Sequence, residues 1–173
     1  AEGKYAGTRV FHAEEQRGLE LMRSLDDAQR TEAVLGDELP PDVFTTAFRD
    51  NFELRYQGVN HTELSAPQQR LLWSVVETYV GRLRPGHADV RLAEVRRHLN
   101  DTRFAWIGGS GDDDVFYYRV HSPVILIEFD HQRGVAFRGV PPSRNHIHSV
   151  VRTPNGNDYG RDLLRQHYLQ HPH

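Results

Sequence analysis

Apolar side chains recur at helical spacing through the first hundred residues, and this pattern predicts a largely helical half of the molecule. The clearest helix begins at Ser65, where Pro67 in the first turn and Gln68 three residues after the cap form a typical helix start. Residues 36–61 show no such period and contain a Pro-Pro pair, so we expect a long ordered loop with a short strand or helix. The predicted helices span roughly residues 14–25, a short segment that carries Ala28, Ala33 and Leu35, residues 65–83 and residues 88–99.

In the last part of the chain the apolar period changes to two, which is typical of strands. A last helix of about residues 159–170 follows, with Asp158 as its cap. Because helices and strands are segregated, the fold class is α+β: a helical N-terminal half packed on an antiparallel β-meander, with a C-terminal helix. We expect one domain or half-domain, mainly helical over 1–100, with the meander and terminal helix over 101–173. The predicted strands are Phe104–Trp106, Val115–Val120, Val124–Asp130 and His146–Arg152.

Composition narrows the function classes. The longest apolar run, Val124–Ile127, is far shorter than the ~18 residues of a membrane helix, so no membrane span is expected. The 21 basic and 24 acidic residues give a net charge of −3, a balance that does not favour nucleic acid as a partner. The chain has no cysteine, which excludes thiolate metal ligands and a cysteine nucleophile. Histidines are therefore the candidate ligands: there are 11, six of them from His131 onward.

The strongest local feature is Asn-His-Ile-His-Ser at residues 145–149. In a strand, His146 and His148 share one face, and Glu128 and Asp130 share a face of the preceding strand. If the two strands pair antiparallel, one register places Asp130 opposite His146 and Glu128 opposite His148, with Cβ atoms ~5 Å apart. Two imidazoles and one or two carboxylates would suit a divalent metal with open positions.

This convergence supports a divalent transition metal as cofactor, with zinc, copper and iron all possible because each accepts imidazole. Asp130 would either hold one of the metal ligands in place by a hydrogen bond or be a further ligand itself. Arg152, on the same face as the histidines, would orient an anionic group or a carboxylate, and His167 on the last helix is a further candidate. The assignment has His146, His148 and Glu128 as metal ligands and Asp130, Arg152 and His167 as catalytic residues.

Two other interpretations of the same residues stay open. In the first, each imidazole donates to a carboxylate across the strands and no metal is bound. In the second, His146 or His148 is a general acid or base, for which titration near neutral pH is suitable.

Several segments carry a resemblance to a known family: Phe-Ala-Trp-Ile-Gly, Phe-Tyr-Tyr-Arg-Val, Ile-Leu-Ile-Glu-Phe-Asp, Asn-His-Ile-His-Ser-Val-Val-Arg and Asn-Asp-Tyr-Gly-Arg-Asp-Leu-Leu-Arg-Gln-His. They resemble the C-terminal half of domain-of-unknown-function family 3500. The helical half is also similar, at Gly3–Phe11, in the leucine helix and at Leu64-Ser-x-x-Gln68. The chain departs from the family at His121-Ser-Pro, where Gly-Pro is usual, and this concerns only that turn.

The resemblance implies no particular reaction, but it does imply a longer parent protein and a cellular location. Family members are commonly longer, with a Gly-His-His motif in an N-terminal part, and many are exported to the periplasm or outside the cell. The chain, which begins Ala-Glu-Gly, would then be a processed product or fragment. A second histidine pair from the N-terminal part would complete the site at His146 and His148.

We therefore expect a metal-dependent enzyme, hydrolytic or oxidative. One alternative is a non-catalytic exported protein that binds a metal or a small ligand; another is the structural half of a two-chain protein. The polar face of a four-stranded sheet needs a cover, from the 131–145 loop, from the last helix or from another chain. We expect an N-terminal partner chain or a homodimer, and a small-molecule ligand is possible.

Overall fold

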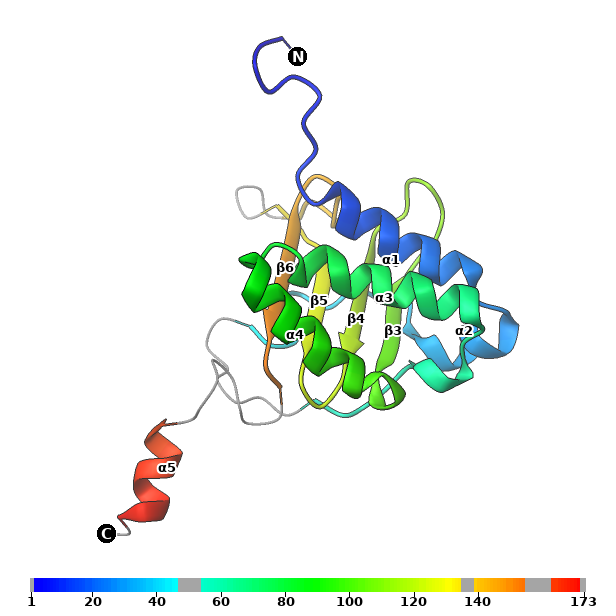
Figure 1. The fold of residues 1–173 in the computed structure, drawn as a ribbon. Helices are drawn as coiled ribbons and strands as arrows, with labels where there is room; N and C mark the ends of the chain where they lie inside the picture. The colour runs from blue at the N-terminus through cyan, green and yellow to red at the C-terminus, as the bar shows by residue number, and fades with distance from the viewer. Residues whose placement is uncertain (1, 47–53, 135–138, 155–162, 172–173) are drawn as a thin grey trace.

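The computed structural model describes residues 2–46, 54–134, 139–154 and 163–171. Helices cover one face of a sheet, as Figure 1 shows. The helices are α1 His12–Ser24, α2 Asp27–Ala33, α3 Ala66–Val80, α4 Pro85–Arg97 and α5 Leu163–Gln170, with short 3-10 turns η1 His61–Glu63 and η2 Leu99–Asp101. The strands are β1 Val34–Gly36, β2 Val59–Asn60, β3 Arg103–Gly108, β4 Phe116–His121, β5 Leu126–His131 and β6 Ile147–Arg152.

Within the described residues the sheet has the order β1-β3-β4-β5-β6, with β2 paired to β3. Strands β3 to β6 form the antiparallel meander that the sequence predicts, and β1 joins β3 in parallel. The α+β class is thus confirmed. Strand β6 is at the edge of this sheet, which leaves one side of its backbone outside the ladder.

The predicted helices are present with shifted ends. The helix start at Ser65 is confirmed, because the Gln68 Oε1 atom accepts a hydrogen bond of 2.7 Å from the Ser65 N–H. The assignment of Leu35 to the second helix is wrong: α2 ends at Ala33 and Leu35 lies in β1, where it joins the parallel ladder with β3. The predicted cap Asp158 lies outside the described residues.

One face of the meander is apolar and packs on the helices. Strand alternation puts Trp106, Tyr118 and Phe129 on this face, and all three are fully buried in the core. Helix α1 approaches closely at Gly18, where an added Cβ would lie 2.3 Å from the Tyr118 Cε1 atom. Other core residues are Leu19, Leu21, Leu72, Val75, Val76, Phe104, Phe116, Val120 and Ile127.

The opposite face of the sheet is polar but also buried. It carries Tyr117, Arg119, Glu128 and Asp130, each no more than 1% exposed. The chain covers this face in part with its own residues 42–46 and 54–57, which we call the covering segment. The cover therefore comes partly from the region read as a loop in the sequence, a source that the strand pattern does not indicate.

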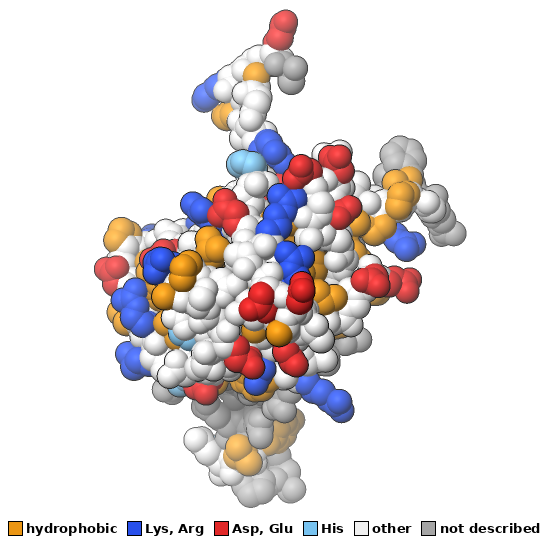
Figure 2. Space-filling view, turned by 90° about the vertical axis from the view of Figure 1, so that its right-hand side faces the viewer, with side chains coloured by type: hydrophobic (Ala, Val, Ile, Leu, Met, Phe, Trp, Pro, Cys, Tyr) orange, Lys and Arg blue, Asp and Glu red, His pale blue; other side chains and the backbone are white. Residues whose placement is uncertain are grey.

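The described ranges contain no helix that is both long and apolar enough to cross a membrane. Figure 2 shows one side of the molecule, on which basic and acidic side chains are interspersed rather than gathered by sign. Helix α5 lies apart from the sheet in Figure 1.

Candidate functional site

The site histidines lie at the start of the edge strand. In the β5–β6 ladder Asp130 lies opposite His148, and Glu128 lies opposite Val150. The predicted register, with Asp130 opposite His146, is wrong by two residues, although the shared face is retained. The hydrogen bonds of the connection before β6 go with the observed register: the His146 C=O accepts from the Gln132 N–H at 2.7 Å, so His146 lies opposite Gln132 rather than Asp130. Its own N–H donates to the Ser143 carbonyl oxygen at 3.2 Å.

The two imidazoles meet through their Nε2 atoms, which are 3.2 Å apart. The rings are nearly perpendicular, at 87°, with centroids separated by 4.8 Å. On the far side of each ring, Nδ1 contacts an acceptor: the Asp42 Oδ1 atom at 2.9 Å from His148, and the Arg133 carbonyl oxygen at 2.6 Å from His146.

These contacts determine where the protons lie. A carbonyl oxygen and an ionised carboxylate can only accept, so both Nδ1 atoms carry hydrogen. In the neutral rings both Nε2 atoms then present lone pairs to each other at 3.2 Å. A cation beside them, either a proton or a metal ion, would remove this repulsion.

The arrangement shares two features with histidines that bind metal ions. Metal-binding histidines usually donate the second ring N–H to a carboxylate or carbonyl, as both do here. Two nitrogen ligands of a tetrahedral zinc ion lie about 3.3–3.4 Å apart, close to the observed separation. Across the described ranges, however, no group of three or more His, Asp or Glu side chains is arranged to hold a metal ion. The histidine pair thus offers two ligand atoms.

Asp130 is a buried carboxyl next to this pair in the ladder. Its Oδ2 atom accepts from the Gln132 side chain, and its Oδ1 atom has no hydrogen-bond partner among the described residues. The pKa of Asp130 is raised to about 8, chiefly by burial; the Gln132 hydrogen bond acts against this rise, and the nearby carboxylates of Asp42 and Glu128 add to it. The carboxyl group can therefore exchange a proton near neutral pH.

Glu128 is occupied by the covering segment. Its Oε1 atom accepts from the Phe44 N–H and the Tyr117 hydroxyl, both at 2.7 Å. Its Oε2 atom accepts from the Thr45 N–H at 3.1 Å and from the Thr45 hydroxyl. This carboxylate holds residues 44 and 45 against the sheet, and by doing so it places Asp42 beside His148.

A cavity of about 690 Å³ runs along β6 from His148 to Arg152. Arg152 donates to the Thr45 carbonyl oxygen and lines the far end of the cavity. His167 is not brought to this place: its side chain is exposed on α5, which lies apart from the sheet (Figure 1). Its catalytic assignment stays a prediction.

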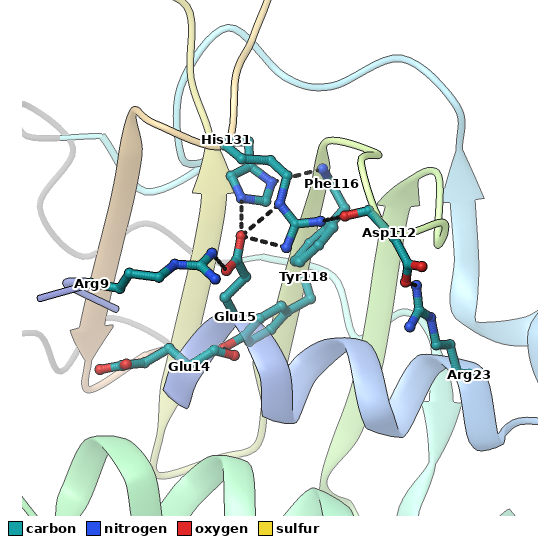
Figure 3. Close-up of polar contacts among 9 residues, drawn as sticks. Arg9, Glu14, Glu15, Arg23, Asp112, Phe116, Tyr118 and His131 are labelled. Carbon is teal, nitrogen blue, oxygen red and sulfur yellow. Dashed lines mark hydrogen bonds and ion pairs between the residues drawn. The ribbon is translucent and has the colours of Figure 1, made fainter. Parts of the chain in front are cut away.

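Glu15, at the start of α1, joins a second polar network (Figure 3). The His131 Nδ1 atom accepts from the Phe116 N–H at 3.0 Å, so Nε2 carries the proton and donates to the Glu15 Oε1 atom at 3.2 Å. Burial lowers the pKa of His131, which keeps the ring neutral. With both nitrogens engaged, His131 has no free lone pair to offer to a metal ion.

Strand parity placed His148, Asp130, Glu128 and Arg152 on one face, but the contacts of the imidazoles were missed. Asp42 and the Arg133 carbonyl come from loops without periodicity. The sequence carries no signal for either.

The fold and site define an α+β protein with a paired-histidine site at the edge of a meander. The sequence profile of a family described as "Protein of unknown function (DUF3500)" matches residues 1–161, and the chain belongs to this family. Comparisons with curated proteins and with solved structures gave no match.

Proposed function

We propose that this protein is a metal-dependent enzyme, hydrolytic or oxidative, in which the Nε2 atoms of His146 and His148 bind a divalent transition metal. One observation carries the proposal: two Nε2 atoms face each other at 3.2 Å while both Nδ1 atoms are held by acceptors. Such a metal would polarise a bound group or activate water.

The remaining side chains receive roles from their positions. Asp130, buried and with one oxygen available, would accept or donate a proton beside His148. Arg152, at the other end of the 690 Å³ cavity, would bind an anionic group of a substrate. Glu128 enters as a positioning residue, because its oxygens are engaged by the covering segment and Tyr117. Its earlier assignment as a ligand stays a prediction.

Two protein nitrogens alone would bind a metal ion weakly, so the proposal requires further ligands. They would come from Asp130, from water or from another chain, for which an N-terminal partner or a second copy is proposed. Export to the periplasm or beyond is proposed on the family resemblance alone. Light scattering during size-exclusion chromatography tests whether the chain needs a partner. A stable folded monomer at micromolar concentration would show that it does not.

The non-catalytic alternative, a protein that binds metal or ligand without turnover, shares the same histidines. The two differ in coordination, because a closed four-ligand site favours structure and an exchangeable water favours catalysis. Counting the water molecules bound to the metal in the metal-loaded protein would distinguish the catalytic from the non-catalytic alternative.

The metal claim has a direct test. Untagged protein is analysed for bound elements and titrated with Zn²⁺, Cu²⁺ and Fe²⁺ beside His146→Ala, His148→Ala and His87→Ala. His87 is exposed on α4 and serves as the matched control. We expect stoichiometric binding of at least one metal by the wild type and His87→Ala. Either site substitution should weaken it by more than the ~10–100-fold that outer-shell changes cost. No stoichiometric binding of any of the three metals would refute the proposal.

A further inference from the structure

A second cavity, of about 480 Å³, has His146 in its lining. It is bordered by residues 8–11 of the N-terminal segment, by Glu15 of α1 and by residues 144–147 before β6. We call it the Arg9–Arg144 cavity after the two arginines on its walls. Thr8 and Asn145, which carry a hydroxyl and an amide, also line this cavity.

The charges around this cavity do not cancel. Among the described residues that line it, Glu15 is the single acidic one, and its side chain is 2% exposed. The Glu15 Oε2 atom contacts Arg9 Nη2 at 3.0 Å, and its Oε1 atom contacts Arg144 Nε at 2.9 Å and Nη2 at 2.8 Å. His131 also contacts Glu15 (Figure 3), and it adds no charge because its Nδ1 atom accepts from the Phe116 N–H, which leaves a neutral ring. Two guanidinium charges thus face one carboxylate, which leaves an excess positive charge at the cavity wall.

Arg144 is held rigidly. Its Nε and Nη2 atoms are fixed by Glu15, its Nη1 atom donates to the Asp112 carbonyl oxygen, and its guanidinium carbon lies 6.0 Å from the centroid of the Phe116 ring. A guanidinium has five N–H donors, so these contacts leave some of them available. Because the side chain is already ordered, a ligand that binds it loses little further conformational entropy.

Arg9 is the more accessible of the two. Its side chain is 59% exposed, and among the described residues its guanidinium has Glu15 as its only hydrogen-bond partner. Most of its donors can therefore turn to a ligand in the cavity. Arginine pairs with carboxylate and phosphate oxygens through two parallel N–H donors, a geometry that neither water nor a neutral ligand matches.

We propose that the Arg9–Arg144 cavity binds an oxyanion group, a carboxylate or a phosphate, of the substrate on which the paired-histidine site acts, at a place separate from Arg152. The assignment to a substrate rests on the proposed function; the anion site itself does not. His146 lines the cavity, so a bound oxyanion would lie beside the imidazole pair. Glu15 is then a positioning residue, since it holds both arginines without occupying all of their donors.

Binding of inorganic phosphate and of acetate to the full chain tests the anion site. Isothermal titration is carried out on metal-stripped protein from which the chelator has been removed, on wild type, Arg9→Gln, Arg144→Gln and Arg17→Gln. Arg17 pairs with Glu20 on the surface of α1 and is the matched control. We expect saturable binding of at least one anion, unchanged in Arg17→Gln and weakened about 10-fold or more in the two cavity variants. The anion that binds more tightly identifies the substrate as a phosphate or a carboxylate.

Two results would overturn the assignment: no saturable binding of either anion to the wild type, or equal binding by Arg9→Gln. Arg144→Gln leaves Glu15 with fewer partners and risks misfolding; the exposed Arg9 then decides the outcome alone. His148→Ala separates the two proposals: His148 does not line the Arg9–Arg144 cavity, so this variant should lose the metal and keep the anion. Metal binding without anion binding would refute this inference only, and the reverse result would refute the proposed function only.

Discussion

The Asp42 carboxylate lies 2.9 Å from the Nδ1 atom of His148, although 106 positions separate the two residues in the chain. The contact orients the imidazole so that Nε2 points at His146. A residue from the covering segment thus decides which nitrogen of a strand histidine is available for binding.

Replacing Asp42 by Asn tests this relationship. The amide keeps a similar shape but loses the negative charge that strengthens the Nδ1–H contact and raises the basicity of Nε2. We expect metal affinity to fall about 10–100-fold, as is usual for such partners, with little change in fold because Asp42 is partly exposed. Metal titration measures the effect, with the exposed Asp37→Asn as control. Equal affinity in Asp42→Asn would show that the contact has no role in binding.

Glu128→Gln tests the attachment of the covering segment. The glutamine amide would direct donors toward groups that already donate, such as the Thr45 N–H or the Tyr117 hydroxyl. A buried polar group left without a partner costs about 1–3 kcal/mol, so we expect the free energy of unfolding to fall by that amount. Urea denaturation measures it beside the exposed Glu32→Gln. Unchanged stability together with loss of metal would instead support Glu128 as a ligand.

Periodicity was sufficient to predict the meander and the shared polar face, because strand alternation assigns each side chain to a side before any pairing is known. It was not sufficient for the register. The connection from β5 to β6 closes through Gln132 and Ser143, and these hydrogen bonds place His146 opposite Gln132 rather than Asp130. No apolar pattern in a loop of this kind specifies where such closure occurs.

The hydrogen-bond partners of the two imidazoles could not be predicted from the sequence, for another reason. Asp42 reaches His148 only because Glu128 binds the backbone of residues 44 and 45. That contact joins segments more than 80 positions apart, and it depends on a loop path that local propensity does not determine. The same holds for the network around Glu15, in which Arg9 and Arg144 come from separate loops.

Gly18→Ala tests the packing of α1 on the sheet. The added methyl group would lie 2.3 Å from the Tyr118 ring, which is fully buried and donates through its hydroxyl to the Glu14 carbonyl oxygen. We expect a loss of about 1–3 kcal/mol in the free energy of unfolding, as for other overpacked cores. Gly86→Ala, in the first turn of α4 with open space around it, should stay within about 1 kcal/mol of wild type. Equal stability of the two variants would contradict the close approach of α1.

His131 should make stability depend on pH. Burial lowers the pKa of His131; Glu15 acts to raise this pKa and Arg144 acts to lower it. The folded protein therefore holds the ring neutral, while the ring in the unfolded chain protonates near pH 6.5. Below that pH the unfolded state binds more protons, and the free energy of unfolding must fall as pH decreases toward the lowered value. Urea denaturation from about pH 5 to about pH 8 should show this loss in wild type and in the exposed control His87→Gln. His131→Gln removes the titrating ring and should flatten that part of the profile, whatever its stability at pH 8. An unaltered slope in His131→Gln would mean that other groups cause the acid loss and that His131 is not held neutral.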